Sequence, residues 1–200
     1  MLGVCNYRTM EAKSRQIIMQ HCPECMYGSV AVPIEKLAEK VFGLELDYQY
    51  ITKHGKAVLG KLVCSDGLTA YYDTELKKYC LIEVKAKTVM IEARLLEDGN
   101  NGRYRFTVAH ELAHWILHKE KIIELQKEAA CGEVISDESM EKQADYFASA
   151  ILMPLGAVKI YYHSLCGKHM NRDEIITDMS EHFEVSKQAM QIRLQSHNLI

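Results

Sequence analysis

The pattern of apolar and polar positions divides the chain into a helical beginning, a strand-rich middle and a helical end. Apolar residues recur at helical spacing over residues 10–19 and again over 33–43. The segment LELDYQYI, 44–51, instead alternates apolar and polar residues, which is typical of a half-buried strand. Because the helical period returns at about 103–119 and dominates beyond 136, the pattern predicts an α+β fold.

The middle third holds the remaining predicted strands. AVLGKLVCSDG, LTAYYD and KTVMIEARLL contain short apolar runs and are punctuated by Gly60 and Gly67. We therefore expect a small, mostly antiparallel sheet packed against helices. We also expect one domain over 1–170 and a helical C-terminal tail over 171–200, which resembles a helix-turn-helix and packs on the same domain.

Composition and charge restrict the class of protein. The net charge of −3 gives no overall positive field for nucleic acid or an anionic membrane. No apolar run approaches the ~20 residues that span a bilayer, and the N-terminus lacks the apolar stretch of a signal peptide. The seven cysteines are odd in number and scattered, which argues against a disulfide framework. We expect a cytoplasmic protein.

The stretch VAHELAHWILH, within the helix predicted at 103–119, carries the candidate chemistry. His110 and His114 are four residues apart, so both rings project from one helix face and can reach one metal ion. Glu111 lies beside them and suits the role of general base toward a water on that ion. An amphipathic helix alone would explain the apolar stripe, but burying these polar groups unpaired is costly. We therefore predict a Zn²⁺ site.

A third ligand is predicted in the next helical segment, SDESMEKQADYFASAILMP, for which Ser136 is the expected N-cap. Glu141 and Asp145 are spaced i, i+4 and share a face. Glu141 is the preferred ligand, and Asp145 can accept the other N–H of a histidine ring and fix its orientation. Glu138, three residues before Glu141, is the rival ligand.

Two further motifs are given no catalytic role. His118 follows His114 by four residues rather than the six of the metzincin pattern, so we expect it to support the fold or line the cleft. HCPEC contains one C-x-x-C pair, Cys22 and Cys25, without the second pair of a zinc ribbon or the strand context of a redox motif. We interpret it as a thiol pair, either buried or facing solvent.

The tail has the wrong charge for a typical DNA-binding element. Residues 173–200 contain five acidic residues and two basic ones, Lys187 and Arg193, which gives a charge of −3. Phosphate contacts supply most non-specific DNA affinity. The tail is therefore expected to pack on the catalytic domain, with DNA binding as the weaker alternative.

RFTVAHELAHWILH and EKQADYFASAILMP resemble the two active-site motifs of the ImmA/IrrE family of metallo-endopeptidases. The resemblance implies a gluzincin-like site with His110, His114 and Glu141 on zinc and Glu111 as general base. It also implies that the substrate is a helix-turn-helix repressor of a mobile element or stress operon, encoded nearby. Ala113 replaces the usual glycine of the family, and Asp145 stands where asparagine is common, and neither change removes a metal ligand.

The sequence thus predicts a regulatory zinc endopeptidase with a protein substrate and no membrane partner. The alternative is a non-catalytic regulatory protein that binds DNA or a partner through its C-terminal helices. Structural zinc sites use four protein ligands, and finding three favours catalysis. The residue that stabilises the oxyanion is left open among four candidates: Tyr146, Tyr161, Tyr162 and His163.

Two expectations concern the substrate. The predicted strand at 87–96 leads into the zinc helix, so an extended peptide could pair with a sheet edge beside the metal. An indiscriminate protease would damage a cytosol, so we expect narrow specificity and little cleavage of generic substrates. The acidic tail is the expected recognition surface for a basic repressor, which makes deletion of 171–200 the corresponding test.

Overall fold

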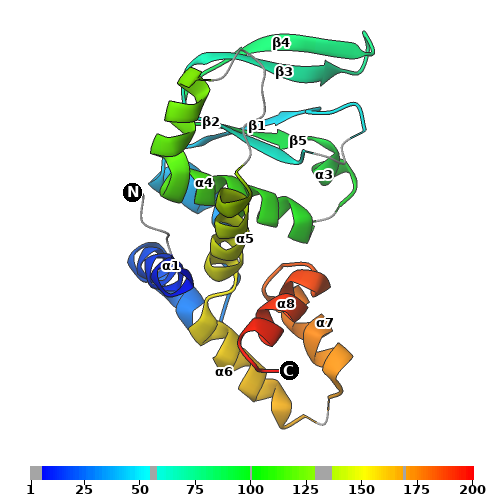
Figure 1. Ribbon diagram of the computed structural model, residues 1–200. Coiled ribbons are helices and arrows are strands. Elements are labelled where there is room, and N and C mark those ends of the chain that lie inside the picture. The colour runs from blue at the N-terminus through cyan, green and yellow to red at the C-terminus, as the bar shows by residue number, and fades with distance from the viewer. Residues whose placement is uncertain (1–5, 55–57, 100, 129–136, 169) are drawn as a thin grey trace.

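The computed structural model of the protein describes residues 6–54, 58–99, 101–128, 137–168 and 170–200. The helices are α1 (Tyr7–His21), the 3₁₀ helix η1 (Pro23–Tyr27), α2 (Ile34–Lys36), the π-helical turn η2 (Leu37–Val41), α3 (Arg94–Glu97), α4 (Asn101–Glu128), α5 (Glu138–Leu152), α6 (Leu155–Cys166), α7 (Arg172–His182) and α8 (Lys187–Ser196). The strands are β1 (Glu45–Gln49), β2 (Gly60–Val63), β3 (Gly67–Asp73), β4 (Lys78–Val84) and β5 (Thr88–Glu92). The strands lie on one side of α4, and α5 and α1 lie on the other (Figure 1).

Five strands form two small sheets within the described residues. One has the order β1-β5-β2, with β5 parallel to β1 and antiparallel to β2, and the other is the antiparallel hairpin β3-β4. The predicted α+β class with a small, mostly antiparallel sheet is confirmed. The sequence pattern did not identify β4.

The position of β5 corrects the expected substrate edge. The strand predicted at 87–96 ends at Glu92, because residues from Arg94 to Glu97 turn into α3. All five β5 residues are buried, and each side of the strand is hydrogen-bonded to a neighbour. β5 therefore offers no free edge. In this sheet of the described structure, the outer strand next to α4 is β2.

Small residues allow α4 and α5 to approach each other closely. Ala109 and Ala113 of α4 are fully buried, as are Ala144 and Ala148 of α5. Alanines at i, i+4 on both helices leave room for the backbones to come together. The contact brings the polar faces of the two helices side by side.

The start of α5 differs in detail from the predicted one. Asp137 is the N-cap and accepts a hydrogen bond from the Ser139 N–H at 2.8 Å. The predicted cap, Ser136, lies outside the described residues. A short acidic cap satisfies the free N–H groups at a helix start equally well.

The C-terminal helices share their core with the rest of the molecule. Met179, Phe183, Met190 and Leu194 are at most 1% exposed and belong to the same apolar cluster as the buried residues of α4 and α5. Arg193 is 1% exposed; it donates a hydrogen bond to the Met153 carbonyl at 3.1 Å. Residues 171–200 therefore contribute to the main core rather than to a separate one.

Among the described residues, no helix combines the length and the apolar character needed to cross a membrane.

Candidate metal centre

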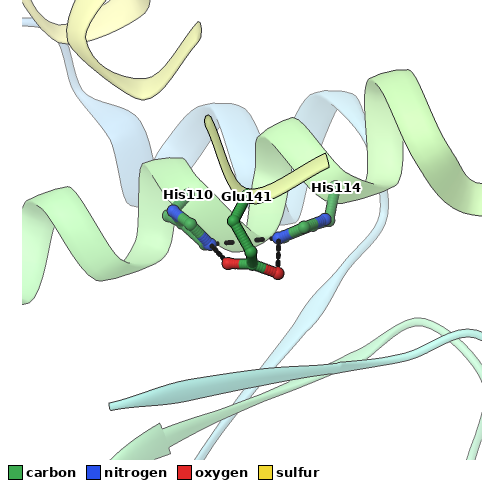
Figure 2. Close-up of side chains that lie close together, drawn as sticks. All are labelled: His110, His114 and Glu141. Atoms are coloured by element: carbon green, nitrogen blue, oxygen red, sulfur yellow. Dashed lines mark hydrogen bonds and ion pairs between the residues drawn. The ribbon is translucent and has the colours of Figure 1, made fainter. Parts of the chain in front are cut away.

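Two crossing helices bring the predicted ligands together. His110 and His114 lie one turn apart on α4, and Glu141 reaches them from α5, as Figure 2 shows. The Glu141 carboxylate lies 3.1 Å from His110 Nε2 and 3.4 Å from His114 Nε2. The two Nε2 atoms are 3.0 Å apart. Three side chains that are up to 31 residues apart in the chain thus converge on one point.

The donor set fits a zinc ion. One ligand atom from each of His110, His114 and Glu141 lies within 4.8 Å of the others. Two imidazole nitrogens and a carboxylate oxygen are a typical catalytic zinc set, which leaves a fourth position for water or substrate. The side chain of His114 is 8% exposed, whereas that of Glu141 is 44% exposed, so the cluster is reached from the Glu141 side.

Asp145 orients His110. Its carboxylate lies 2.9 Å from His110 Nδ1. An ionised carboxylate can only accept, so Nδ1 carries the proton and the Nε2 lone pair faces the cluster. Burial alone would lower the pKa of His110, but the hydrogen bond to Asp145 and the charges of Glu111, Asp145 and Glu141 outweigh it and raise this pKa.

His118 holds the second ligand in a similar way. Its Nδ1 lies 3.2 Å from His114 Nδ1, and its Nε2 lies 3.3 Å from the Gln143 Oε1. One proton arrangement satisfies both contacts of His118: His114 Nδ1–H donates to His118 Nδ1, and His118 Nε2–H donates to Gln143. The His114 Nε2 lone pair then faces the cluster. His118 therefore has a more specific place than the general structural role expected from sequence.

The electrostatic environment keeps His114 ready to bind a cation. Burial, with smaller contributions from His110 and His118, lowers the pKa of His114 to about 3. An imidazole must be neutral to bind a metal ion. At neutral pH the Nε2 atom of His114, which faces the cluster, therefore carries no proton that a metal ion would have to displace.

The Glu111 side chain extends from α4 toward the edge of β2. This residue is 7% exposed. The Leu62 N–H donates a hydrogen bond to its carboxylate. The Leu59 carbonyl accepts from the Glu92 N–H of β5, and the Val63 carbonyl accepts from the Lys87 N–H just before β5. The backbone groups of the alternate residues Gly60 and Leu62 therefore point toward the outer edge and Glu111. Burial raises the pKa of Glu111 to about 7, and the Leu62 hydrogen bond opposes that rise. A carboxyl with this pKa exchanges a proton readily near neutral pH.

Gly60 allows this close approach, and the glycine itself is the one sign of it in the sequence. A Cβ atom at position 60 would lie 2.7 Å from Glu111 Oε1 and 2.7 Å from Thr107 Cγ2. Such distances are shorter than van der Waals contact. Glycine is therefore the residue that lets β2 pass directly beside the carboxylate.

The rival ligand and the candidate oxyanion residues have other partners. Glu138 pairs with Lys142 at 2.6 Å and is not in the His-His-Glu cluster. The Tyr146 hydroxyl donates to Glu11 at 3.0 Å. The other three candidates, Tyr161, Tyr162 and His163, are on α6, which packs against η1 and α7.

The C-x-x-C pair and the basic residues of the tail, which were given no catalytic role, also have defined positions. Cys22 and Cys25 are free and buried, and burial raises the pKa of both thiols, that of Cys22 to about 12. In the tail, Arg193 pairs with Glu11 at 2.5 Å inside the core. Of the two bases counted in 173–200, only Lys187 is exposed, so Arg193 is not placed to contact a phosphate backbone.

The fold and the cluster together define a class of protein. An H-E-x-x-H helix beside a strand edge, with a carboxylate supplied by the following helix, is the arrangement of zinc-type metallopeptidases. The family model for the IrrE N-terminal-like domain of peptidase family M78 matches residues 72–195, and the chain belongs to this family. A comparison with curated proteins gives no match. The expected family is confirmed, and the match extends from β3 into α8.

Proposed function

We propose that the protein is a zinc-dependent endopeptidase that cleaves a specific cytosolic protein. The observation that carries this proposal is the convergence of His110, His114 and Glu141 within 4.8 Å, with Glu111 next to His110 on the same helix. Membership in a peptidase family supports hydrolysis of a peptide bond.

The proposed mechanism assigns one role to each side chain. His110, His114 and Glu141 hold the zinc ion, and Asp145 and His118 fix the two rings. When bound, the ion supplies Lewis acidity toward water and the scissile carbonyl. Glu111 takes the proton of the attacking water and passes it to the leaving amine, a transfer that suits its pKa of about 7.

The substrate is proposed to bind as an extended segment along β2. The outward N–H and C=O of Gly60 and the outward C=O of Leu62 are the pairing groups that this sheet edge offers to a peptide strand, because the Leu62 N–H already donates to Glu111. A segment paired there passes directly beside Glu111. A flexible region of a substrate can adopt this shape, whereas a rigid helix cannot.

A repressor with a helix-turn-helix domain, encoded near this protein, is the proposed substrate. The resemblance to the ImmA/IrrE family supports this choice. The acidic balance of the chain, −3 overall, also suits a basic, DNA-binding partner.

The test combines metal analysis with cleavage of the repressor from the neighbouring operon. We expect wild type to bind one zinc per chain and to cut the repressor in a flexible segment. Glu111→Gln should keep the zinc and lose cleavage, and His110→Ala should lose both. Glu141→Ala should lose zinc, whereas Glu138→Gln, a matched change on the same helix, should alter neither property.

Two outcomes would overturn the proposal. One is wild-type protein without stoichiometric zinc after reconstitution. The other is a stable complex of the intact repressor with both wild type and Glu111→Gln, which would favour a non-catalytic binding protein.

A further inference from the structure

A cavity of about 790 Å³ lies beside the candidate metal centre and is lined mainly by residues of α4, α5 and α8. It extends to the start of α1 and to the residue before β2. Its apolar lining consists of Tyr7, Leu59, Phe106, Tyr146, Ala189 and Ile192. The volume is within the ~300–1,000 Å³ that is usual for ligand sites, and it exceeds what one side chain needs.

The cavity is continuous with the site. Asp145 lines it and also holds His110 at 2.9 Å. Thr107 lines it and lies next to Gly60, where β2 passes Glu111. A peptide on the β2 edge with its scissile bond near Glu111 would therefore place neighbouring side chains at the mouth of this cavity.

α8 forms one wall of the cavity and is held firmly in that position. A Cβ atom at Gly102 of α4 would lie 2.7 Å from the backbone N of Ser186, the N-cap of α8. Arg105 of α4 donates to the Glu184 carbonyl at 3.2 Å. The wall is thus fixed to the same helix that carries the two histidines.

Ile192 is the exposed apolar residue of this wall. It is 55% exposed, although Arg193 and Leu194 beside it are buried. The cavity also contains the charged residues Arg103, Lys142 and Asp145, beside its aromatic and aliphatic lining, and most of its lining surface is apolar. Apolar walls with a few polar groups favour apolar ligand groups.

We propose that this cavity binds large apolar side chains on one side of the scissile bond, and that Ile192 determines this specificity. The proposal rests on the proposed peptidase function and deepens it, because it assigns the chemical class of residue that the enzyme selects. It also makes the C-terminal helix part of the substrate site.

The experiment selects ligands without requiring cleavage. A displayed library of random 12-residue peptides is panned against zinc-loaded, full-length Glu111→Gln protein. We expect the selected peptides to be enriched in Leu, Ile, Phe and Met. Introducing Ile192→Asp should weaken their binding at least tenfold, because a carboxylate would be placed against apolar side chains. The matched change Ile160→Asp, at a position 52% exposed on α6, should leave binding within twofold.

A second variant keeps the test valid if Ile192→Asp fails to fold. Ile192→Trp narrows the cavity, so a selection against it should shift toward smaller residues. Selected peptides without apolar enrichment, or equal binding by the Ile192 and Ile160 variants, would overturn the cavity proposal.

Incubating the selected peptides with enzyme that carries Glu111 separates the two proposals. Cleavage that does not depend on Ile192 would overturn the cavity proposal and leave the peptidase proposal intact. Binding that depends on Ile192, without cleavage by zinc-loaded protein, would support the cavity and count against the peptidase.

Discussion

Replacing Gly60 with alanine tests whether β2 positions the candidate base. The added Cβ would lie 2.7 Å from Glu111 Oε1, 2.7 Å from Thr107 Cγ2 and 2.9 Å from Glu111 Cγ. Ordinary contact begins at 3.4 Å, so these atoms must move by about 0.7 Å (3.4 minus 2.7). The Glu111 carboxylate is the end of a flexible side chain, whereas Thr107 is β-branched and buried on α4. We expect the carboxylate to move furthest.

The size of the effect follows from that displacement. Overpacking of a buried site costs about 1–3 kcal/mol of folding free energy, and this cost should appear as a lower urea midpoint. A misplacement near 1 Å can reduce catalysis by about 100-fold. For about 0.7 Å we expect kcat/KM to fall by about 10- to 100-fold. Zinc stoichiometry should not change, because the clashing atoms belong to none of the three proposed ligands.

The assay compares the first residues of two consecutive strands, Gly60 of β2 and Gly67 of β3. A Cβ at Gly67 would meet nothing within 4 Å, so Gly67→Ala should be close to neutral in stability and activity. Urea unfolding gives the stability of both variants, and cleavage of the repressor or of a selected peptide gives the activity.

A second substitution tests the origin of the Gly60→Ala defect. Thr107→Ser removes Cγ2 but keeps the hydroxyl that donates to the Arg103 carbonyl at 3.0 Å. In the Gly60→Ala background it should restore part of the lost stability, which a double-mutant cycle would report as coupling. Full activity of Gly60→Ala, or equal losses in the Gly60 and Gly67 variants, would refute the reasoning.

The remaining predictions concern a second histidine and a buried thiol. His118→Phe should weaken zinc binding by about 10- to 100-fold, as loss of a ligand-orienting partner does. His118→Gln should recover part of the lost zinc affinity, and competition with a chelator measures both variants. Unchanged affinity in folded His118→Phe would contradict this role. At pH 8, iodoacetamide should label exposed Cys166 well before Cys22, because a pKa of about 12 leaves Cys22 almost wholly protonated. Peptide mass spectrometry measures both labels, and equal rates in folded protein would contradict the buried thiol.

The local geometry of the site could be predicted because it depends on helical periodicity. The spacing of His110 and His114 requires that they share a helix face, and the same spacing puts Glu141 and Asp145 together. Residue spacing within each helix does not predict that α4 and α5 pack against each other. That packing depends on the small residues Ala109, Ala113, Ala144 and Ala148, which are all buried at the contact.

The parts of the site that were missed depend on contacts across the chain. Gly60 and Glu111 are 51 positions apart, and nothing local in either segment indicates that they touch. Strand order is a similar case: a fully buried strand such as β5 could be central or covered by helices. The role of His118 is a third case, because zinc-ligand spacing patterns describe the ligands and not the side chains that hold them.

The tail illustrates how burial changes the choice of experiment. Its acidic charge suggested a recognition surface that could be removed by deleting 171–200. The structure puts Met190, Leu194 and the paired Arg193 inside the main core, so deletion would expose that core and unfold the domain that carries the site. Loss of activity after deletion would then say nothing about recognition. A single change at Ile192 keeps the buried face of α8 and alters only the wall that faces the cavity, so it is the perturbation that separates substrate recognition from folding.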